Sequence, residues 1–321
     1  MPAYINIVSL ANLAGLSRDS RILSRVLSDA GFIVTVNAVH QSALRRGIHT
    51  AAKFIREYPF DVNVFLEQIF PYALPLAPIN CLLSNQEWLR DECRRYLPRM
   101  DIILCKTQHA HELFREMGYK AVFTSFTSYD RRSATSQMDY KRFLHLAGSN
   151  VQKGTSTVID LWSRHPEWPA VKVIQSPNRR QAVTAANITY IVEHVDDELL
   201  TEMQNTHGIH LCPSEAEGFG HTIVEGMSCR ALVITTNGAP MNEIVTPERG
   251  MLADYHASEP QRLGTRFYVD PRSLEEKVLA VMAMSEESKR TLGENARRWY
   301  EQNDRSFKRR IVEAIRSLLK T

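Results

Sequence analysis

Short runs of apolar residues alternate with amphipathic stretches along most of the chain. Up to residue 126, six such runs predict β-strands: Tyr4–Leu10, Phe32–Val39, Asp61–Glu67, Ile79–Ser84, Asp101–Cys105 and Ala121–Phe126. Continuous apolar runs are typical of parallel strands that are buried on both faces. Apolar residues at helical spacing predict helices at Arg18–Ala30 and His109–Met117. Ser17 is the expected N-cap of the first helix, and Gly31 is expected to end it.

The same alternation restarts after Ser128–Tyr140, a stretch rich in Ser, Thr, Arg and Gln that indicates a linker. The strands expected beyond it are Phe143–Ala147, Val171–Gln175, Ile188–Val192, Ile209–Cys212 and Ala231–Thr235. The helices expected there are Gly154–Ser163, Asp196–Asn205, Gly220–Cys229, Ser273–Met284, Glu286–Asn303 and Arg305–Leu319. The pattern predicts two α/β domains with parallel sheets, residues 1–135 with about 304–321, and residues 141–303. Ligands of such sheets bind outside the carboxyl ends of the strands, so we expect a site in a cleft between the domains.

The length of 321 residues suits two domains better than a single core. The five cysteines are odd in number and widely spaced, which indicates reduced, buried thiols and neither a disulfide framework nor a zinc site. No run of about 18 apolar residues predicts a membrane helix. The first ten residues show no secretory leader. We therefore expect a cytoplasmic protein.

The net charge of +3 is distributed unevenly along the chain. Residues 1–140 and 301–321 together hold 22 Lys and Arg against 16 Asp and Glu, whereas residues 141–300 hold 17 against 20. A basic first half could favour an anionic acceptor or peripheral contact with the inner face of a membrane. A difference of this size is also common in two-domain enzymes with neither partner. We expect no nucleic acid partner.

The sharpest local pattern lies between residues 211 and 225, where a predicted strand ends, a loop follows and a helix begins. Gly218 and Gly220 flank Phe219 in this loop. Glycines let the backbone approach a ligand because no Cβ is in the way. The free N–H groups of a helix that begins near His221 favour an anion such as a diphosphate.

Two carboxylates, Glu217 and Glu225, lie eight residues apart on this loop and helix. Carboxylates accept hydrogen bonds from adjacent hydroxyl groups, which is what recognition of a ribose or a hexose requires. A second loop, Gly148–Gly154, also follows a predicted strand and opens a helix. Its Lys153 can neutralise a phosphate with help from the helix dipole. The two patterns together indicate a site for sugar hydroxyls and a diphosphate.

The order and spacing of these residues resemble those of retaining GT-B glycosyltransferases of family four, also called glycosyl transferases group 1. The resemblance covers the second half of the chain, from Val195–Leu199 through Glu217–Gly220 and Glu225 to the loop Asn237–Val245. It implies two Rossmann-like doubly wound domains that face a central cleft. It also implies a C-terminal helix that crosses back to the first domain.

The resemblance assigns roles to individual residues. It implies that Glu225 holds the ribose hydroxyls, that Glu217 binds the transferred sugar near the reacting centre, and that Lys153 is the main diphosphate cation. Glu217 and Lys153 are therefore the catalytic candidates. The implied donor-binding residues are Gly15, Ser149, Asn150, Lys153, Glu217, Gly218, Phe219, Gly220, His221, Thr222 and Glu225.

The chain departs from the family pattern in two places. Ser149 stands where the family usually has an arginine. Either Asn150 and the backbone suffice to bind the diphosphate, or an arginine arrives from elsewhere, or the affinity for the donor is low. Asn85 stands where the family often has a histidine near the reacting carbon. The acceptor-side candidates, for which plain helix capping is the alternative, are Asn85, Gln86, Glu87 and Lys106.

The sequence has no Asp-x-Asp pair and no two histidines at metal-ligand spacing on one helix, so we expect neither a metal nor another cofactor. The implied activity is retaining transfer of a sugar from a nucleoside diphosphate sugar, with a UDP-sugar as the default. The acceptor would be a hydroxyl of a sugar, a lipid-linked precursor or another molecule in polysaccharide or glycoconjugate assembly. Two alternatives stay open: a nucleotide-sugar epimerase on the same fold, and a non-catalytic nucleotide-sugar-binding protein.

Overall fold

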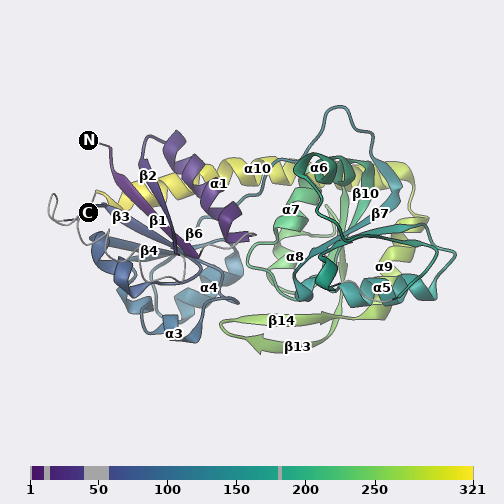
Figure 1. Cartoon of the computed structure of the whole chain (residues 1–321), viewed down its shortest axis with the longest axis horizontal. Helices are drawn as coiled ribbons and strands as arrows, with labels where there is room; N and C mark the ends of the chain where they lie inside the picture. Colours follow the sequence, from purple (N-terminus) through teal and green to yellow (C-terminus); the bar gives the residue numbers. More distant parts are fainter. Residues whose placement is uncertain (1, 11–14, 40–57, 180–182, 321) are drawn as a thin grey trace. The chain divides into compact units, whose positions relative to one another are not determined.

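A computed structural model describes residues 2–10, 15–39, 58–179 and 183–320 (Figure 1). The chain divides into two compact units, residues 1–126 with 305–321, and residues 127–304. Each unit contains a six-stranded sheet in which every pairing between neighbouring strands is parallel. The predicted α/β fold class, with two Rossmann-like sheets, is confirmed.

The sheet of the first unit has the strand order β2-β1-β3-β4-β5-β6. Its strands are β1 (Tyr4–Leu10), β2 (Ile33–Val39), β3 (Val62–Leu66), β4 (Ile79–Ser84), β5 (Ile102–Cys105) and β6 (Ala121–Phe123). Its helices are α1 (Gly15–Asp29), η3 (Pro71–Leu76), α3 (Asp91–Arg94), η4 (Leu97–Arg99) and α4 (Gln108–Glu116). The central strands β3, β4 and β5 are almost wholly buried, as their continuous apolar runs predict.

The helix boundaries of the first unit follow local capping chemistry, with one correction. Ser17 is not the N-cap of α1, because the helix begins at Gly15 and the Ser17 carbonyl accepts hydrogen bonds from Ser20 and Arg21 inside it. Gly31 follows the helix with a φ of +91°, a conformation that glycine adopts at low cost, so this prediction is confirmed. Thr107 caps α4, since its hydroxyl accepts a 3.1 Å bond from the amide of Ala110.

The sheet of the second unit has the strand order β12-β11-β10-β7-β8-β9. Its strands are β7 (Asp139–Gly148), β8 (Val171–Gln175), β9 (Ile188–Ile191), β10 (His207–Cys212), β11 (Leu232–Thr236) and β12 (Met251–Ala253). Its helices include η5 (Val151–Lys153), α5 (Thr155–Arg164), η6 (Pro177–Arg179), α6 (Asp197–Thr206), α7 (His221–Ser228), α8 (Met241–Ile244) and α9 (Pro271–Ala283). Phe143 and Trp162 pack edge to face in its core, with ring centroids 5.2 Å apart.

A two-stranded antiparallel hairpin, β13 (Tyr255–Gln261) and β14 (Gly264–Val269), lies apart from the second six-stranded sheet in Figure 1. The sequence analysis did not predict it. Residues Tyr255–Pro260 of β13 are exposed, and the strand contains Glu259 and Pro260, so neither apolar alternation nor strand composition marks it.

The chain ends in one long helix, α10 (Glu286–Leu318), so the prediction of two helices here is wrong. No glycine or proline separates Asn303 from Arg305, and helical hydrogen bonding therefore continues through Asp304. The last turns belong to the first unit. There Phe307 packs edge to face on Phe126, with ring centroids 4.8 Å apart. The expected return of the C-terminal helix to the first domain is thus observed.

The polar stretch Ser128–Tyr140, which the sequence indicates as a linker, groups with the second unit. The amide of Arg131 donates to the Ser228 hydroxyl over 3.0 Å, and the amide of Ser133 donates to Asn205 over 2.9 Å. Polar side chains of α6 and α7 therefore satisfy backbone N–H groups of this stretch.

Candidate functional site

Two loops at the carboxyl edge of the second sheet contact each other through their backbones. The loop after β7 contains Lys153, and the loop Pro213–Gly220 follows β10. The amide of Glu215 donates a 2.8 Å hydrogen bond to the carbonyl of Gln152. A Cβ added at Gly154, which has a φ of +66°, would lie 2.2 Å from the Pro213 carbonyl oxygen. Only glycine fits here, and it lets the two loops meet.

This contact brings together Lys153 and Glu217, the two catalytic candidates. The Lys153 ammonium group forms an ion pair with a Glu217 carboxylate oxygen, and the two side chains are only 12% and 10% exposed. The Thr222 hydroxyl lies 3.5 Å from the same nitrogen. One mostly buried cation, one carboxylate and one hydroxyl therefore share a point next to the first turn of α7.

The glycine loop enters α7 in the way that the sequence predicts. Gly220 is its N-cap and has a φ of +87°. The Phe219 side chain is 4% exposed and contacts the His221 ring edge to face, so this aromatic residue anchors the loop and is not free to stack on a ligand. His221 Nδ1 hydrogen-bonds the Ser128 hydroxyl, which fixes its ring. Gly218 lies buried between Glu217 and Phe219.

The Glu225 carboxylate contacts two other side chains of the second unit. It is buried, accepts a 3.2 Å bond from the Gln204 side chain and lies 3.8 Å from Arg131 Nε. Arg131 is in turn held by Asp197 over 2.6 Å. A ribose that binds Glu225 must therefore compete with, or insert beside, these two side chains. The sequence analysis did not foresee them because Arg131 lies 94 residues before Glu225 in the chain.

The phosphate-loop candidates Ser149 and Asn150 have different environments. Ser149 is exposed at the turn after β7. The Asn150 side-chain oxygen accepts a 2.9 Å bond from the amide of Gln152 and caps η5. The side-chain oxygen of Asn150 therefore stabilises the turn that contains Lys153.

The hairpin β13–β14 supports the same loops. Glu215, two residues before Glu217, forms an ion pair with Arg266 of β14 over 2.6 Å. The amide of Phe267 also donates to the Glu215 carbonyl over 2.7 Å. Gln261 of β13 exchanges side-chain hydrogen bonds with Gln152. These residues were missed because their contacts join positions 51 and 109 residues apart.

His145 of β7 connects the strand to both loops. One ring nitrogen lies 2.8 Å from the Leu211 carbonyl oxygen and the other 2.9 Å from the Thr155 hydroxyl. Burial, with a smaller contribution from the nearby Lys153 charge, lowers the pKa of His145 to about 4. The ring is therefore neutral at pH 7 and adds no positive charge to the site.

The acceptor-side candidates lie in the first unit. Asn85 does not cap a helix, because α3 begins only at Asp91; its side chain donates to Glu67 over 3.1 Å. Gln86 and Glu87 follow it in a buried turn. Lys106 is 3% exposed and pairs with Asp19 over 2.5 Å. Gly15 is the first residue of α1, and residues 11–14 before it lie outside the described residues.

A family model described as glycosyl transferases group 1 matches residues 110–299, which is more than half of the chain. The chain belongs to the glycosyl transferases group 1 family. An uncharacterised glycosyltransferase of Methanocaldococcus jannaschii is 37% identical over 86 residues. That match spans 26% of this chain and 20% of the relative.

Solved structures of glycosyltransferases share the fold of this group 1 glycosyltransferase. Sucrose-phosphate synthase from Thermosynechococcus elongatus superimposes with a TM-score of 0.73 at 15% identity, covering 99% of each chain. Anabaena HepE in complex with UDP and glucose gives 0.70 at 12% identity, covering 98% of this chain and 100% of that one. WaaG, a glycosyltransferase of lipopolysaccharide biosynthesis, gives 0.66 at 14% identity, covering 97% and 99%. The identities are low, so these structures show the GT-B fold alone.

The described part of this glycosyltransferase shows two further properties. Its helices include none that is both long and apolar enough to cross a membrane. All five cysteines are buried and free, as predicted.

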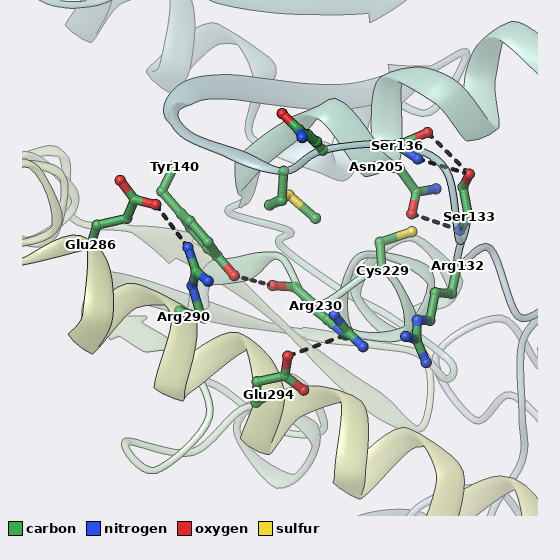
Figure 2. Close-up of a pocket in the computed structure, with 12 residues that line it drawn as sticks. Arg132, Ser133, Ser136, Tyr140, Asn205, Cys229, Arg230, Glu286, Arg290 and Glu294 are labelled. Carbon is green, nitrogen blue, oxygen red and sulfur yellow. Dashed lines mark hydrogen bonds and ion pairs between the residues drawn. The ribbon is translucent and has the colours of Figure 1, made fainter.

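A cavity of about 450 Å³ lies elsewhere in the second unit (Figure 2). Two of its arginines are already paired with glutamates, Arg230 with Glu294 over 3.3 Å and Arg290 with Glu286 over 3.0 Å. No predicted donor-binding residue lines this cavity. It is therefore separate from the Lys153 loop.

Proposed function

We propose that this glycosyltransferase moves a sugar from a nucleoside diphosphate sugar to an acceptor hydroxyl, with retention at the anomeric carbon and without a metal ion. One observation carries the proposal: two loops far apart in the sequence bring Lys153 and Glu217 together beside the first turn of α7. A cation and helix N–H groups suit a diphosphate, and a carboxylate suits sugar hydroxyls.

In the proposed reaction the diphosphate lies against the start of α7 and takes the Lys153 ammonium group from Glu217. The Glu217 carboxylate, released from its ion pair, then accepts hydrogen bonds from the sugar. The bond between the anomeric carbon and the phosphate oxygen breaks while the acceptor oxygen bonds to the same face of that carbon. The departing phosphate oxygen takes the acceptor proton, and Lys153 stabilises the charge that develops on it.

The solved structures support the donor class. HepE has the same fold and was solved with UDP, with UDP and glucose, and with UDP-glucose. We therefore propose a UDP-sugar as the default donor. WaaG acts in lipopolysaccharide biosynthesis, and a hydroxyl of a sugar or of a lipid-linked precursor is the acceptor class that we propose. Such an acceptor fits a cytoplasmic enzyme in peripheral contact with a membrane.

The test measures donor binding and turnover together. Thermal unfolding would be followed with UDP, GDP, ADP, TDP and CDP and their common sugars, and nucleotide release would be measured with a panel of sugar acceptors. A ligand at 100 times its Kd adds about 2.7 kcal/mol to the folded state. This corresponds to a rise in Tm of roughly 5–10 °C for a unit of this size.

We expect one nucleotide to stabilise the wild type and its sugar to be consumed only when an acceptor is present. Lys153→Met should lose the Tm shift, whereas Glu198→Gln, at an exposed position of α6, should keep it. Donor binding with no turnover would refute the transferase proposal and favour a non-catalytic binding protein. Conversion of the donor to an isomer without acceptor would favour an epimerase.

A further inference from the structure

The first unit gathers polar side chains at the carboxyl edge of its sheet. Strands β3, β4 and β5 are neighbours, and each is followed directly by a polar residue: Glu67, Asn85 and Lys106. Asp19 of α1 reaches the same edge, because it pairs with Lys106. Ligands of parallel α/β sheets bind at this edge. Glu67 was not among the residues that the sequence analysis selected.

The backbone of Glu67 adopts an unusual conformation. Its φ is +64°, in the left-handed region that residues with a Cβ rarely occupy. The amide of Glu67 donates to the Leu83 carbonyl over 3.0 Å, which holds the residue beside the end of β4. A conformation that is costly for glutamate and easy for glycine indicates that the carboxylate itself has a role.

The Glu67 carboxylate has hydrogen-bonding capacity to spare. One oxygen accepts a 3.1 Å bond from Asn85 Nδ2 and the other a 3.2 Å bond from Gln68 Nε2. A carboxylate offers about four acceptor positions, so both oxygens can take a further donor. Burial raises the pKa of Glu67, although the hydrogen bonds from Asn85 and Gln68 and the charge of Lys106 oppose this rise.

Two amide oxygens in the turn that follows β4 also lack donors. Asn85 Oδ1 and Gln86 Oε1 are buried, and within residues 2–10, 15–39, 58–179 and 183–320 neither oxygen has a hydrogen-bond partner. Buried polar atoms are normally paired. The Glu67 carboxylate and the two unpaired amide oxygens are all acceptors, so together they suit a ligand that donates several hydrogen bonds. The hydroxyl groups of a sugar have this chemistry.

We propose that Glu67, Asn85 and Gln86, here called the carboxyl-edge cluster, bind hydroxyl groups of the sugar acceptor, with Glu67 as the principal hydrogen-bond acceptor. This inference rests on the proposed transferase function and assigns its acceptor contact to specific residues. Gln68 fixes the position of the cluster. Its side-chain nitrogen also donates to the carbonyl of Trp88 over 2.6 Å, and its side-chain oxygen accepts from the amide of Arg90 over 3.1 Å.

The test compares Glu67→Gln with Glu112→Gln, a matched change at an exposed position of α4. The donor is the nucleotide sugar consumed by the wild type, and the acceptors are p-nitrophenyl glycosides of the common hexoses. We expect Glu67→Gln to raise the acceptor KM at least tenfold and to leave the donor KM and the hydrolysis of donor by water within twofold. Glu112→Gln should match the wild type. An unchanged acceptor KM, or a parallel rise in the donor KM, would overturn the proposal.

Glu67→Gly separates a binding role from a structural one. Glycine relieves the positive φ, so a residue that is kept for ligand binding should give a variant with unchanged or raised Tm and greatly reduced transfer. A clear fall in Tm would show that Glu67 serves the fold, and the proposal would fail. If the wild type transfers to no acceptor, the transferase proposal fails first, which distinguishes the two failures.

Discussion

Replacing Lys153 with methionine removes one half of an ion pair whose side chains are only 12% and 10% exposed. Methionine keeps most of the side-chain length, so the main change is the loss of the ammonium group beside Glu217. Removing one partner of a fully buried pair costs about 3–5 kcal/mol in unfolding free energy, because the other charge stays buried alone. Since about a tenth of each side chain reaches solvent, we expect a loss of roughly 2–4 kcal/mol for Lys153→Met.

The double variant Lys153→Met with Glu217→Met distinguishes this explanation from simple loss of packing. It removes both charges and keeps apolar volume, and such replacements of buried pairs are often neutral or stabilising. We expect it to lie within about 1 kcal/mol of the wild type, which gives a coupling energy of at least about 2 kcal/mol between the two positions.

Urea unfolding followed by tryptophan fluorescence would measure these energies. Three of the four tryptophans, Trp162, Trp168 and Trp299, lie in the second unit, so the signal reports mainly on its unfolding. The exposed pair Arg290–Glu286 provides the control, with an expected coupling of about 0–1 kcal/mol. Additive losses for Lys153→Met and Glu217→Met would refute the reasoning.

Three further outcomes are expected. Arg266→Ala should raise the donor KM several-fold with little change in the acceptor KM, because the hairpin no longer holds Glu215 and the loop before Glu217. Arg262→Ala, at the hairpin turn, is the control, and identical kinetics for the two variants would contradict this expectation. Gly154→Ala should lower Tm by several degrees, since its Cβ would collide with a backbone carbonyl; an unchanged melting curve would exclude that strain. Burial lowers the pKa of His145 to about 4, so the folded state stays neutral while the unfolded state gains a proton below pH 6.5. Stability should therefore fall between pH 6.5 and 4 by up to about 1.4 kcal/mol per pH unit for this residue, and His145→Asn should flatten the curve of urea midpoint against pH.

The apolar runs predicted eleven of the twelve strands of the two parallel sheets to within a few residues, because strands buried on both faces need side chains that tolerate complete burial; the short edge strand β12 was missed. The glycine loop before α7 was predicted from Gly218 and Gly220, and Gly220 has the positive φ that glycine adopts at low cost. The hairpin β13–β14 has mostly exposed, polar residues, so no apolar pattern marked it.

The chain by itself thus determined the type of fold and the two loops that carry Lys153 and Glu217. Only the tertiary structure decided which side chains meet. The ion pair joins residues 64 positions apart, and the contact of Glu215 with Arg266 spans 51 positions. The positive φ of Glu67 also has no local signal, because it follows from the packing of β3 beside β4 and not from the preference of a glutamate. Sequence patterns record burial and turn chemistry, whereas contacts between distant residues depend on the register and order of the strands.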